Sequence, residues 1–234
     1  MPADRRAVEE SERQQVHEHL GRALREARTA QGISLRALAA DIGISASLLS
    51  QVENGKSQPS VSTLYALVSR LRVSLDDLLG LGGPPPPGVR GTEQAAGSLR
   101  RPDFVLQRAD DTPALVMDSG VRWERLASIE DGLVDSLLVI YPPGAASSAD
   151  GTLMRHSGFE YGYLLTGSLT LVLEFDRYHL RAGDSFCFES SRPHLYVNHG
   201  EEATRGLWHV VGRDAAPQTP ERFADLLGHE PIGE

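Results

Sequence analysis

The sequence predicts a multidomain protein in which an all-α domain of five helices is followed by an all-β sandwich or barrel. Residues 16 to 80 carry apolar side chains at helical spacing. Residues 81 to 101 are rich in glycine and proline, and the part after Pro102 consists of short β-branched and aromatic runs. The length of 234 residues suffices for two ordinary domains.

Serine residues mark where the predicted helices begin. A first helix ends at Gly32, and Ser34, Ser45, Ser60 and Ser74 each precede a run with apolar residues on one face. A serine hydroxyl accepts a hydrogen bond from the free N–H groups of a helix's first turn. Four capped helices are therefore expected after the first, and the last of them, "SLDDLLG", is short.

The remaining segments fix the expected domain boundaries. Residues 1 to 15 are polar and are expected to form a disordered tail, and residues 81 to 101 a linker stiffened by its prolines. The β-rich domain is expected over residues 102 to 213. No helical crossovers separate its strands, so they should pair antiparallel. Residues 214 to 234 should hold a short helix capped by Thr219 and a tail.

Composition excludes several classes of protein. No run approaches the roughly 20 apolar residues that span a bilayer. The N-terminal stretch "MPADRRAVEESERQQ" lacks the apolar core of a signal peptide, and Cys187, the single cysteine, cannot form an internal disulfide. We expect a cytoplasmic protein with no membrane partner.

Charge is distributed unevenly between the two parts. The chain carries −9 overall, but residues 20 to 75 hold seven basic and three acidic residues, a local charge of +4. Residues 81 to 234 carry −9. This asymmetry favours a helical part that tolerates phosphate, joined to a part that does not.

The second and third predicted helices, "SLRALAADIGISASLLSQVENGKSQPS", are joined by a short turn containing glycine. This is the spacing of a helix-turn-helix, in which the second helix enters the major groove of DNA. Residues 17 to 80 closely resemble the Xre/Cro-like repressor family, and "LSQVENGKSQPS" is the most distinctive phrase.

That resemblance implies which residues contact an operator. Base-facing positions would be Ser45, Ala46, Ser47 and Gln51, and positions near phosphate Arg36, Ser50, Asn54 and Lys56. Gln51 can donate to and accept from an adenine edge, whereas Ala46 and Ser47 are short and suit thymine methyl groups or water-mediated contacts. The alternative is a five-helix fold without DNA activity.

Two motifs of the β-rich part resemble the cupin family, whose fold is a double-stranded β-helix or jelly-roll barrel. "MRHSGFEYGYLLTG" supplies His156, Glu160 and Gly167, and "GDSFCFESSRPHLYVN" supplies His194 and Asn198. The match covers residues 135 to 212. Met154 stands where the family's first histidine would be, which leaves His156, Glu160 and His194 as candidate ligands.

Two histidines and one carboxylate form a recognised divalent-metal set with open positions. His156 and Glu160 share parity on an extended strand, so both can point inward. The metal could be Fe, Mn, Zn or Ni. Alternatively, the three side chains bond to one another in a barrel that binds only an organic ligand.

The barrel interior is the expected effector pocket, because small barrels enclose their sites among inward side chains. We assign to it Met154, Tyr163, Phe188, Tyr196, Asn198 and Trp208. For each aromatic residue alone, packing in the core is the competing assignment.

The resulting prediction is a transcriptional regulator, a repressor by family resemblance, rather than an enzyme. It would bind a double-stranded operator as a homodimer and respond to a small-molecule effector. The layout is also similar to hydroxypropylphosphonate epoxidase, so the alternative is a non-haem Fe(II) enzyme that activates oxygen. A third alternative is a pure interaction module.

Overall fold

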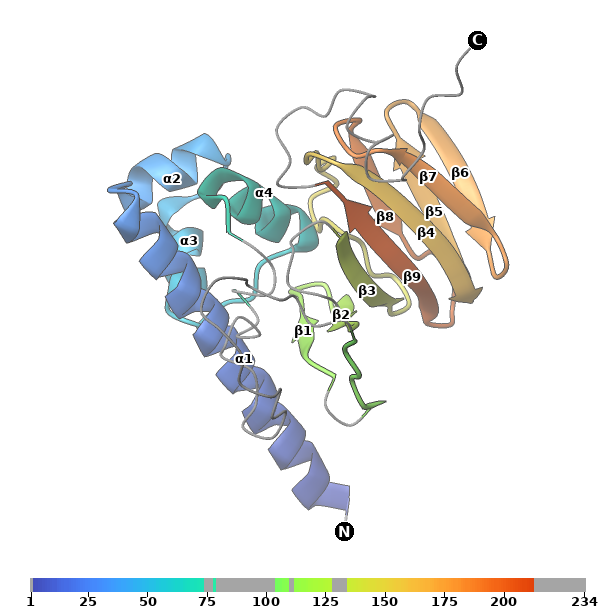
Figure 1. Ribbon diagram of the computed structural model, residues 1–234, viewed down its shortest axis with the longest axis horizontal. Coiled ribbons are helices and arrows are strands. Elements are labelled where there is room, and N and C mark those ends of the chain that lie inside the picture. The colour runs from blue at the N-terminus through green and yellow to red at the C-terminus, as the bar shows by residue number, and fades with distance from the viewer. Residues whose placement is uncertain (1, 74–77, 79–103, 110–111, 128–133, 213–234) are drawn as a thin grey trace, which may run out of the picture.

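The computed structural model describes residues 2–73, 78, 104–109, 112–127 and 134–212 (Figure 1). A helical domain lies beside a β-rich domain, as the sequence predicts. The expected linker, the helix from Thr219 and nearly all of the fifth helix fall outside the described residues. Leu78, from that fifth helix, is described as helical and buried.

The helical domain contains α1 (Pro2–Ala30), α2 (Leu35–Asp41), α3 (Ala46–Glu53) and α4 (Val61–Leu71). Ser34, Ser45 and Ser60 are the N-caps of the last three helices, as predicted. Each hydroxyl accepts the N–H of the residue three positions later. Leucine and valine side chains from all four helices form the core.

The first helix is longer than expected. α1 begins at Pro2, so it includes the residues predicted as a disordered tail. The segment "ADRRAVEESERQQ" is rich in alanine, arginine, glutamate and glutamine, which are strong helix formers, and proline is tolerated in a first helical turn. Its polarity therefore did not indicate a lack of helical propensity.

The β-rich domain contains β1 (Ala114–Val116), β2 (Arg122–Arg125), β3 (Val134–Tyr141), β4 (Phe159–Thr166), β5 (Ser168–Leu173), β6 (Asp176–Arg181), β7 (Ser185–Glu189), β8 (His194–Val197) and β9 (Thr204–Val211). One sheet has the order β1-β2-β3-β9-β4-β7 and the other β6-β5-β8. Every described pairing is antiparallel, as predicted. Buried residues of both sheets make the core of this domain.

The two domains are in direct contact through α4 and α1 (Figure 1), and His17 Nε2 on α1 lies 2.8 Å from the carbonyl of Val116 on β1. The N–H of Ser62 donates to the carbonyl of Ser147, and the N–H of Asp118 donates to the carbonyl of Pro59. Among the described helices, none is both long enough and apolar enough to cross a bilayer.

Candidate nucleic-acid interface and metal centre

The helix predicted to read DNA is exposed on its outer side. A short turn with Gly43 at a positive φ of 74° joins α2 to α3 and lets the chain reverse within a few residues. Leu49 and Val52 point into the core, whereas Ser47 and Gln51 are exposed to solvent. The side of α3 that is predicted to face the bases is therefore open to solvent and accessible to DNA.

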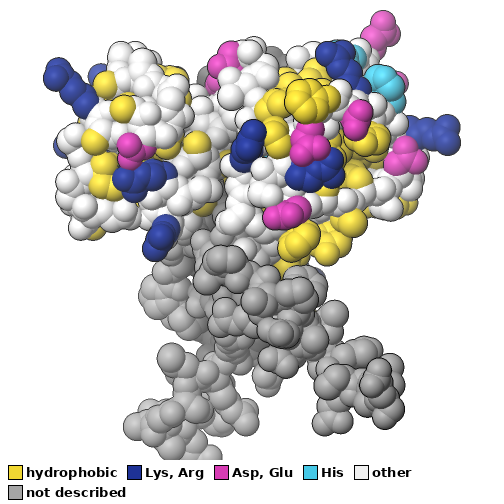
Figure 2. Space-filling view, turned by 90° about the horizontal axis from the view of Figure 1, so that it is seen from above, with side chains coloured by type: hydrophobic (Ala, Val, Ile, Leu, Met, Phe, Trp, Pro, Cys, Tyr) yellow, Lys and Arg dark blue, Asp and Glu magenta, His cyan; other side chains and the backbone are white. Residues whose placement is uncertain are grey.

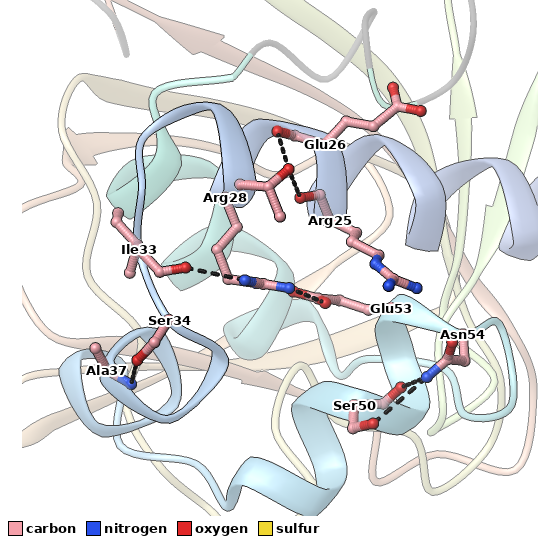
Figure 3. Close-up of polar contacts among 10 residues, drawn as sticks. Arg25, Glu26, Arg28, Ile33, Ser34, Ala37, Ser50, Glu53 and Asn54 are labelled. Atoms are coloured by element: carbon pink, nitrogen blue, oxygen red, sulfur yellow. Dashed lines mark hydrogen bonds and ion pairs between the residues drawn. The ribbon is translucent and has the colours of Figure 1, made fainter.

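The other predicted DNA contacts differ in accessibility. Arg36 and Lys56 are exposed, as a phosphate contact requires. Ala46 is half-buried, and Ser50 is half-buried beside Asn54, whose amide donates to the Ser50 carbonyl at 2.6 Å (Figure 3). Asn54 is the C-cap of α3, and its side-chain amide donates its hydrogen bond within the protein.

A buried ion pair fixes the end of the recognition helix to α1. Arg28 Nε and Nη2 donate to the two carboxylate oxygens of Glu53 at 2.6 and 2.8 Å, and Arg28 Nη1 donates to the carbonyl of Ile33 at 2.9 Å (Figure 3). Sequence analysis counted Arg28 among the basic residues that favour phosphate. The structure corrects this, because its guanidinium is buried and holds the fold together.

In Figure 2 basic side chains predominate over acidic ones on the helical domain, whereas basic and acidic side chains together surround an apolar area of the β-rich domain. Arg28 and Glu53 neutralise each other, so the other six basic and two acidic residues of this segment still carry the whole local charge of +4. The distribution agrees with the asymmetry read from the sequence.

The three candidate metal ligands meet in the interior of the β-rich domain. His156 precedes β4, Glu160 lies on β4, and His194 begins β8. The Nε2 atoms of His156 and His194 lie 2.6 and 3.0 Å from Glu160 Oε1. All three side chains are buried, and their ligand atoms lie within 4.8 Å of one another. The sequence prediction that they come together is confirmed.

Backbone contacts determine which ring nitrogens face the centre. His156 Nδ1 lies 3.1 Å from the carbonyl of Ser157, and His194 Nδ1 lies 2.8 Å from the carbonyl of Arg192. A carbonyl can only accept, so each Nδ1 carries a proton and donates it. Each Nε2 would then present a lone pair to a bound metal, which is the usual arrangement of a metal-binding histidine. Without a metal, the 2.6 Å contact between His156 Nε2 and Glu160 Oε1 is a hydrogen bond, which requires a proton on that nitrogen as well.

The polar groups at this centre are incompletely satisfied. His194 Nε2 is fully buried and close to Glu160 Oε1, but it lacks the alignment of a hydrogen bond. Two imidazole lone pairs and a carboxylate directed at one point repel each other unless a cation or added protons lie between them. The donor set therefore fits a divalent metal, which would be held by His156, Glu160 and His194.

The electrostatics keep the carboxylate charged and its phenolic neighbour neutral. Burial alone would raise the pKa of Glu160, but the imidazoles of His156 and His194 outweigh it and hold that pKa well below its usual range. Tyr196 donates to Glu160 Oε2 at 2.6 Å, and burial together with the Glu160 charge raises the pKa of its phenol. Tyr196 thus orients the carboxylate by a donated hydrogen bond.

A cavity of about 10 Å³ adjoins this centre. Met154, Tyr196 and Trp208 line it, as the sequence predicts for the effector pocket. Phe188 packs edge-on against the ring of His194 with centroids 4.9 Å apart. It therefore contacts one of the candidate metal-binding residues and does not line the cavity.

Two of the predicted pocket residues lie elsewhere. Tyr163 is 44% exposed on the outer side of β4, because it has the opposite parity to the inward Glu160. Asn198 is buried, but its amide donates to the carbonyls of Tyr141, Pro142 and Glu202. Asn198 therefore holds loops together and takes no part in the cavity wall.

Sequence analysis missed six residues of the cavity wall, which are Val61, Tyr65, Trp123, Leu137, Val139 and Tyr141. The alternation in "DSLLVIY" could have indicated the last three, because they share one face of β3. Val61 and Tyr65 belong to α4 of the other domain, and periodicity within one segment cannot indicate a contact between domains.

Comparison with known families agrees with both halves of this description. Residues 24–78 match the family described as Helix-turn-helix, and residues 137–210 match the family described as Cupin domain. The chain joins a helix-turn-helix domain to a cupin domain. Both resemblances drawn from the sequence motifs are thereby confirmed.

Individual relatives share this layout. The HTH-type transcriptional regulator PuuR of Escherichia coli (strain K12) is 27% identical over 207 residues, which cover 87% of this chain and 96% of the relative. The PuuR of Shigella flexneri matches to the same extent. This similarity over both domains supports a DNA-binding regulator.

Solved structures show the likeness in fold. An HTH_3 family transcriptional regulator from Vibrio cholerae has a TM-score of 0.58 at 20% identity, with 86% of this chain and 99% of that chain covered. Hydroxypropylphosphonic acid epoxidase from S. wedmorenis has a TM-score of 0.42 at 19% identity, covering 83% of this chain and 97% of the enzyme. A likeness at that level does not bear on the activity of this chain.

Proposed function

We propose that this chain is a sequence-specific transcriptional repressor whose cupin domain responds to a small-molecule effector and holds a divalent metal. The observation that carries the first part is the exposed outer side of α3 in a helix-turn-helix domain. The similarity to PuuR over both domains supports it.

In this proposal α3 enters the major groove and Gln51 reads a base edge, with Ser45, Ala46 and Ser47 beside it. Arg36 and Lys56 bind the phosphates on either side. The buried pair of Arg28 and Glu53 holds α3 at the angle required for insertion.

The chain would act as a homodimer, which suits an operator with two half-sites one helical turn apart. The outer side of β4 supports this part of the proposal. Phe159, Tyr161, Tyr163 and Leu165 alternate along the strand and are each at least 40% exposed. A second copy that covered this apolar stripe would remove it from water.

The metal would be held by His156, Glu160 and His194, and it would supply a Lewis-acidic centre with open positions for an effector. The protein's own groups prepare that centre. Backbone carbonyls fix the histidine tautomers, and Tyr196 orients the carboxylate. The similarity to PuuR over 87% of this chain favours a regulator over an oxygen-activating enzyme.

DNA binding is tested by fluorescence anisotropy with fragments of the promoters nearest the gene. Gln51→Ala should weaken specific binding by about 5- to 150-fold, which corresponds to about 1–3 kcal/mol for one base contact. Gln15→Ala, an exposed glutamine change on α1, should leave it unchanged. Equal binding by Gln51→Ala and the wild type would show that α3 does not read the operator.

Metal binding is tested by elemental analysis of protein purified without chelators and by titration with Co²⁺. His194→Ala should lower the affinity by at least about 100-fold, because it removes a direct ligand. His199→Ala is the matched control, since His199 is exposed and outside the cluster. Equal affinity in these two variants would refute the ligand assignment.

A further inference from the structure

One aromatic residue of the DNA-binding domain lies against a candidate metal ligand of the cupin domain. The ring of Tyr65, on α4, stacks on the ring of His156 with centroids 4.2 Å apart and an angle of 9° between the planes. Its edge meets Trp123 at 5.2 Å. Tyr65 is 4% exposed, so this contact is part of a buried interface.

The helix that carries Tyr65 is buried on two sides. Leu64, Leu67 and Leu71 pack in the helical core. Val61 and Tyr65, one turn apart on the same face, line the cavity of the cupin domain instead. α4 is thus shared between the core of the DNA-binding domain and the wall of the candidate effector site.

The cavity is too small for an organic molecule while Tyr65 stays in place. Its volume of about 10 Å³ is at the lower limit for one water molecule. Pockets for small organic ligands measure roughly 300–1,000 Å³. An organic ligand can therefore enter only if part of the wall withdraws.

The wall contains one part that is able to withdraw as a unit. Leu137, Val139, Glu160 and Trp208 lie on neighbouring strands joined by continuous ladders. Val61 and Tyr65 lie on a helix of the other domain, which is tied to the β-rich domain by the backbone bonds of Ser62 and Asp118 and by the contact of His17 with the carbonyl of Val116.

A route to the cavity lies beside α4. A groove of about 810 Å³ runs between the domains, bounded by the turn from α2 to α3, by α4 and by residues 148–155. Met154 lines both this groove and the inner cavity. A molecule in the groove is therefore one side chain away from the centre formed by His156, Glu160 and His194.

We propose that Tyr65 closes the cupin site, so that an organic ligand entering it displaces Tyr65 and moves α4 together with the recognition helix. This rests on the proposed function, because it assumes that the cupin site receives the effector. α3 and α4 both pack against α1, so a shift of α4 that moves the helical domain as one body reorients α3 relative to the β-rich domain. Tyr65 would be the residue through which occupancy reaches the DNA-binding surface.

Hydrogen exchange of two amides reports this contact directly. The N–H of Ser62 lies in the first turn of α4, where helices provide no internal acceptor, so its protection depends on the carbonyl of Ser147 across the interface. The N–H of Asp118 likewise depends on the carbonyl of Pro59. Both should exchange faster whenever α4 leaves the β-rich domain.

Tyr65→Ala should speed exchange of the Ser62 and Asp118 amides by at least about tenfold in the full chain. Tyr65→Phe, which keeps the ring, should stay close to wild type. The amide of Leu67, inside α4, should exchange alike in all three proteins, which shows that the helical domain is still folded. Unchanged exchange at Ser62 and Asp118 in Tyr65→Ala would overturn the proposal.

The second measurement uses imidazole as a probe ligand on Co²⁺-loaded wild type. Imidazole is larger than the cavity, so its binding, seen in the Co²⁺ absorption spectrum, should speed exchange of the same two amides. Binding without that change would overturn the coupling. A further outcome is that Co²⁺ fails to bind while Tyr65→Ala still speeds exchange of the Ser62 and Asp118 amides. That result would refute metal binding by His156, Glu160 and His194 and would leave the closing role of Tyr65 standing.

Discussion

Replacing Glu53 with glutamine should destabilise the helical domain far more than a similar change in an exposed ion pair. The substitution keeps the shape of the side chain but removes the charge opposite Arg28. Those two side chains are only 3% and 10% exposed, so the guanidinium would stay buried without a counter-charge. Breaking such a pair costs about 3–5 kcal/mol, a large share of the about 5–15 kcal/mol that stabilises a typical domain.

The chain provides a matched control. Arg70 and Asp41 join α4 to α2 at 2.7 Å, a distance like that of the buried pair, but their side chains are 40% and 42% exposed. Water screens this pair, so Asp41→Asn should cost only about 0–1 kcal/mol. The two ion pairs have nearly the same distance between their charged atoms and differ in how far their side chains are buried.

Urea unfolding followed by far-ultraviolet circular dichroism measures both changes, because most of the helical signal comes from α1 to α4. Glu53→Gln should shift the midpoint of the helical transition strongly, and Asp41→Asn hardly at all. Operator binding should weaken in Glu53→Gln as α3 loses its attachment to α1. Equal losses of stability in the two variants would refute the argument from burial.

Three further changes test other parts of the structure. Gly21→Ala should destabilise the helical domain by about 1–3 kcal/mol in urea unfolding, because the new Cβ would lie 2.5 Å from a carbonyl oxygen at the end of α3, and this clash exceeds the gain in helix propensity of about 1 kcal/mol; a stabilised variant would contradict it. The hydroxyl of Ser148 lowers the pKa of Asp150 to about 2, so Asp150 should stabilise the fold above its ordinary pKa near 3.8 and lose that contribution as the pH falls towards 2. The stability difference between wild type and Asp150→Asn should then shrink as the pH falls from about 4 to 2, and a difference that stayed constant over that range would argue against it. Tyr163→Glu should convert a dimer to a monomer in light scattering, whereas Tyr178→Glu, on an exposed position of β6, should not; dimers in both would place the interface elsewhere.

Local chemistry made much of the fold predictable. Ser34, Ser45 and Ser60 cap their helices with bonds that reach only three residues along the chain, so the sequence alone locates these helix starts. The candidate metal ligands were predictable because two motifs of the sequence resemble those of the cupin family. His156 and Glu160 share parity near one strand, and the motif containing His194 marks the other.

Parity also explains the error at Tyr163. It lies three positions after the inward Glu160, an odd number, so it points outward, and the alternation along β4 was sufficient to show this. Asn198 is different. Its type and position suited a pocket, and only the folded loops revealed that its amide satisfies three backbone carbonyls.

The sequence by itself determined the two domains and the helix caps, because periodicity and capping act over a few residues, and the resemblance of its motifs to the cupin family supplied the metal-ligand candidates. Only the tertiary structure decided that Arg28 is buried against Glu53 and that Tyr65 stacks on His156. These contacts join segments that are remote in the chain. Which residues meet in them depends on how whole domains pack, and a pattern within one short segment cannot indicate it.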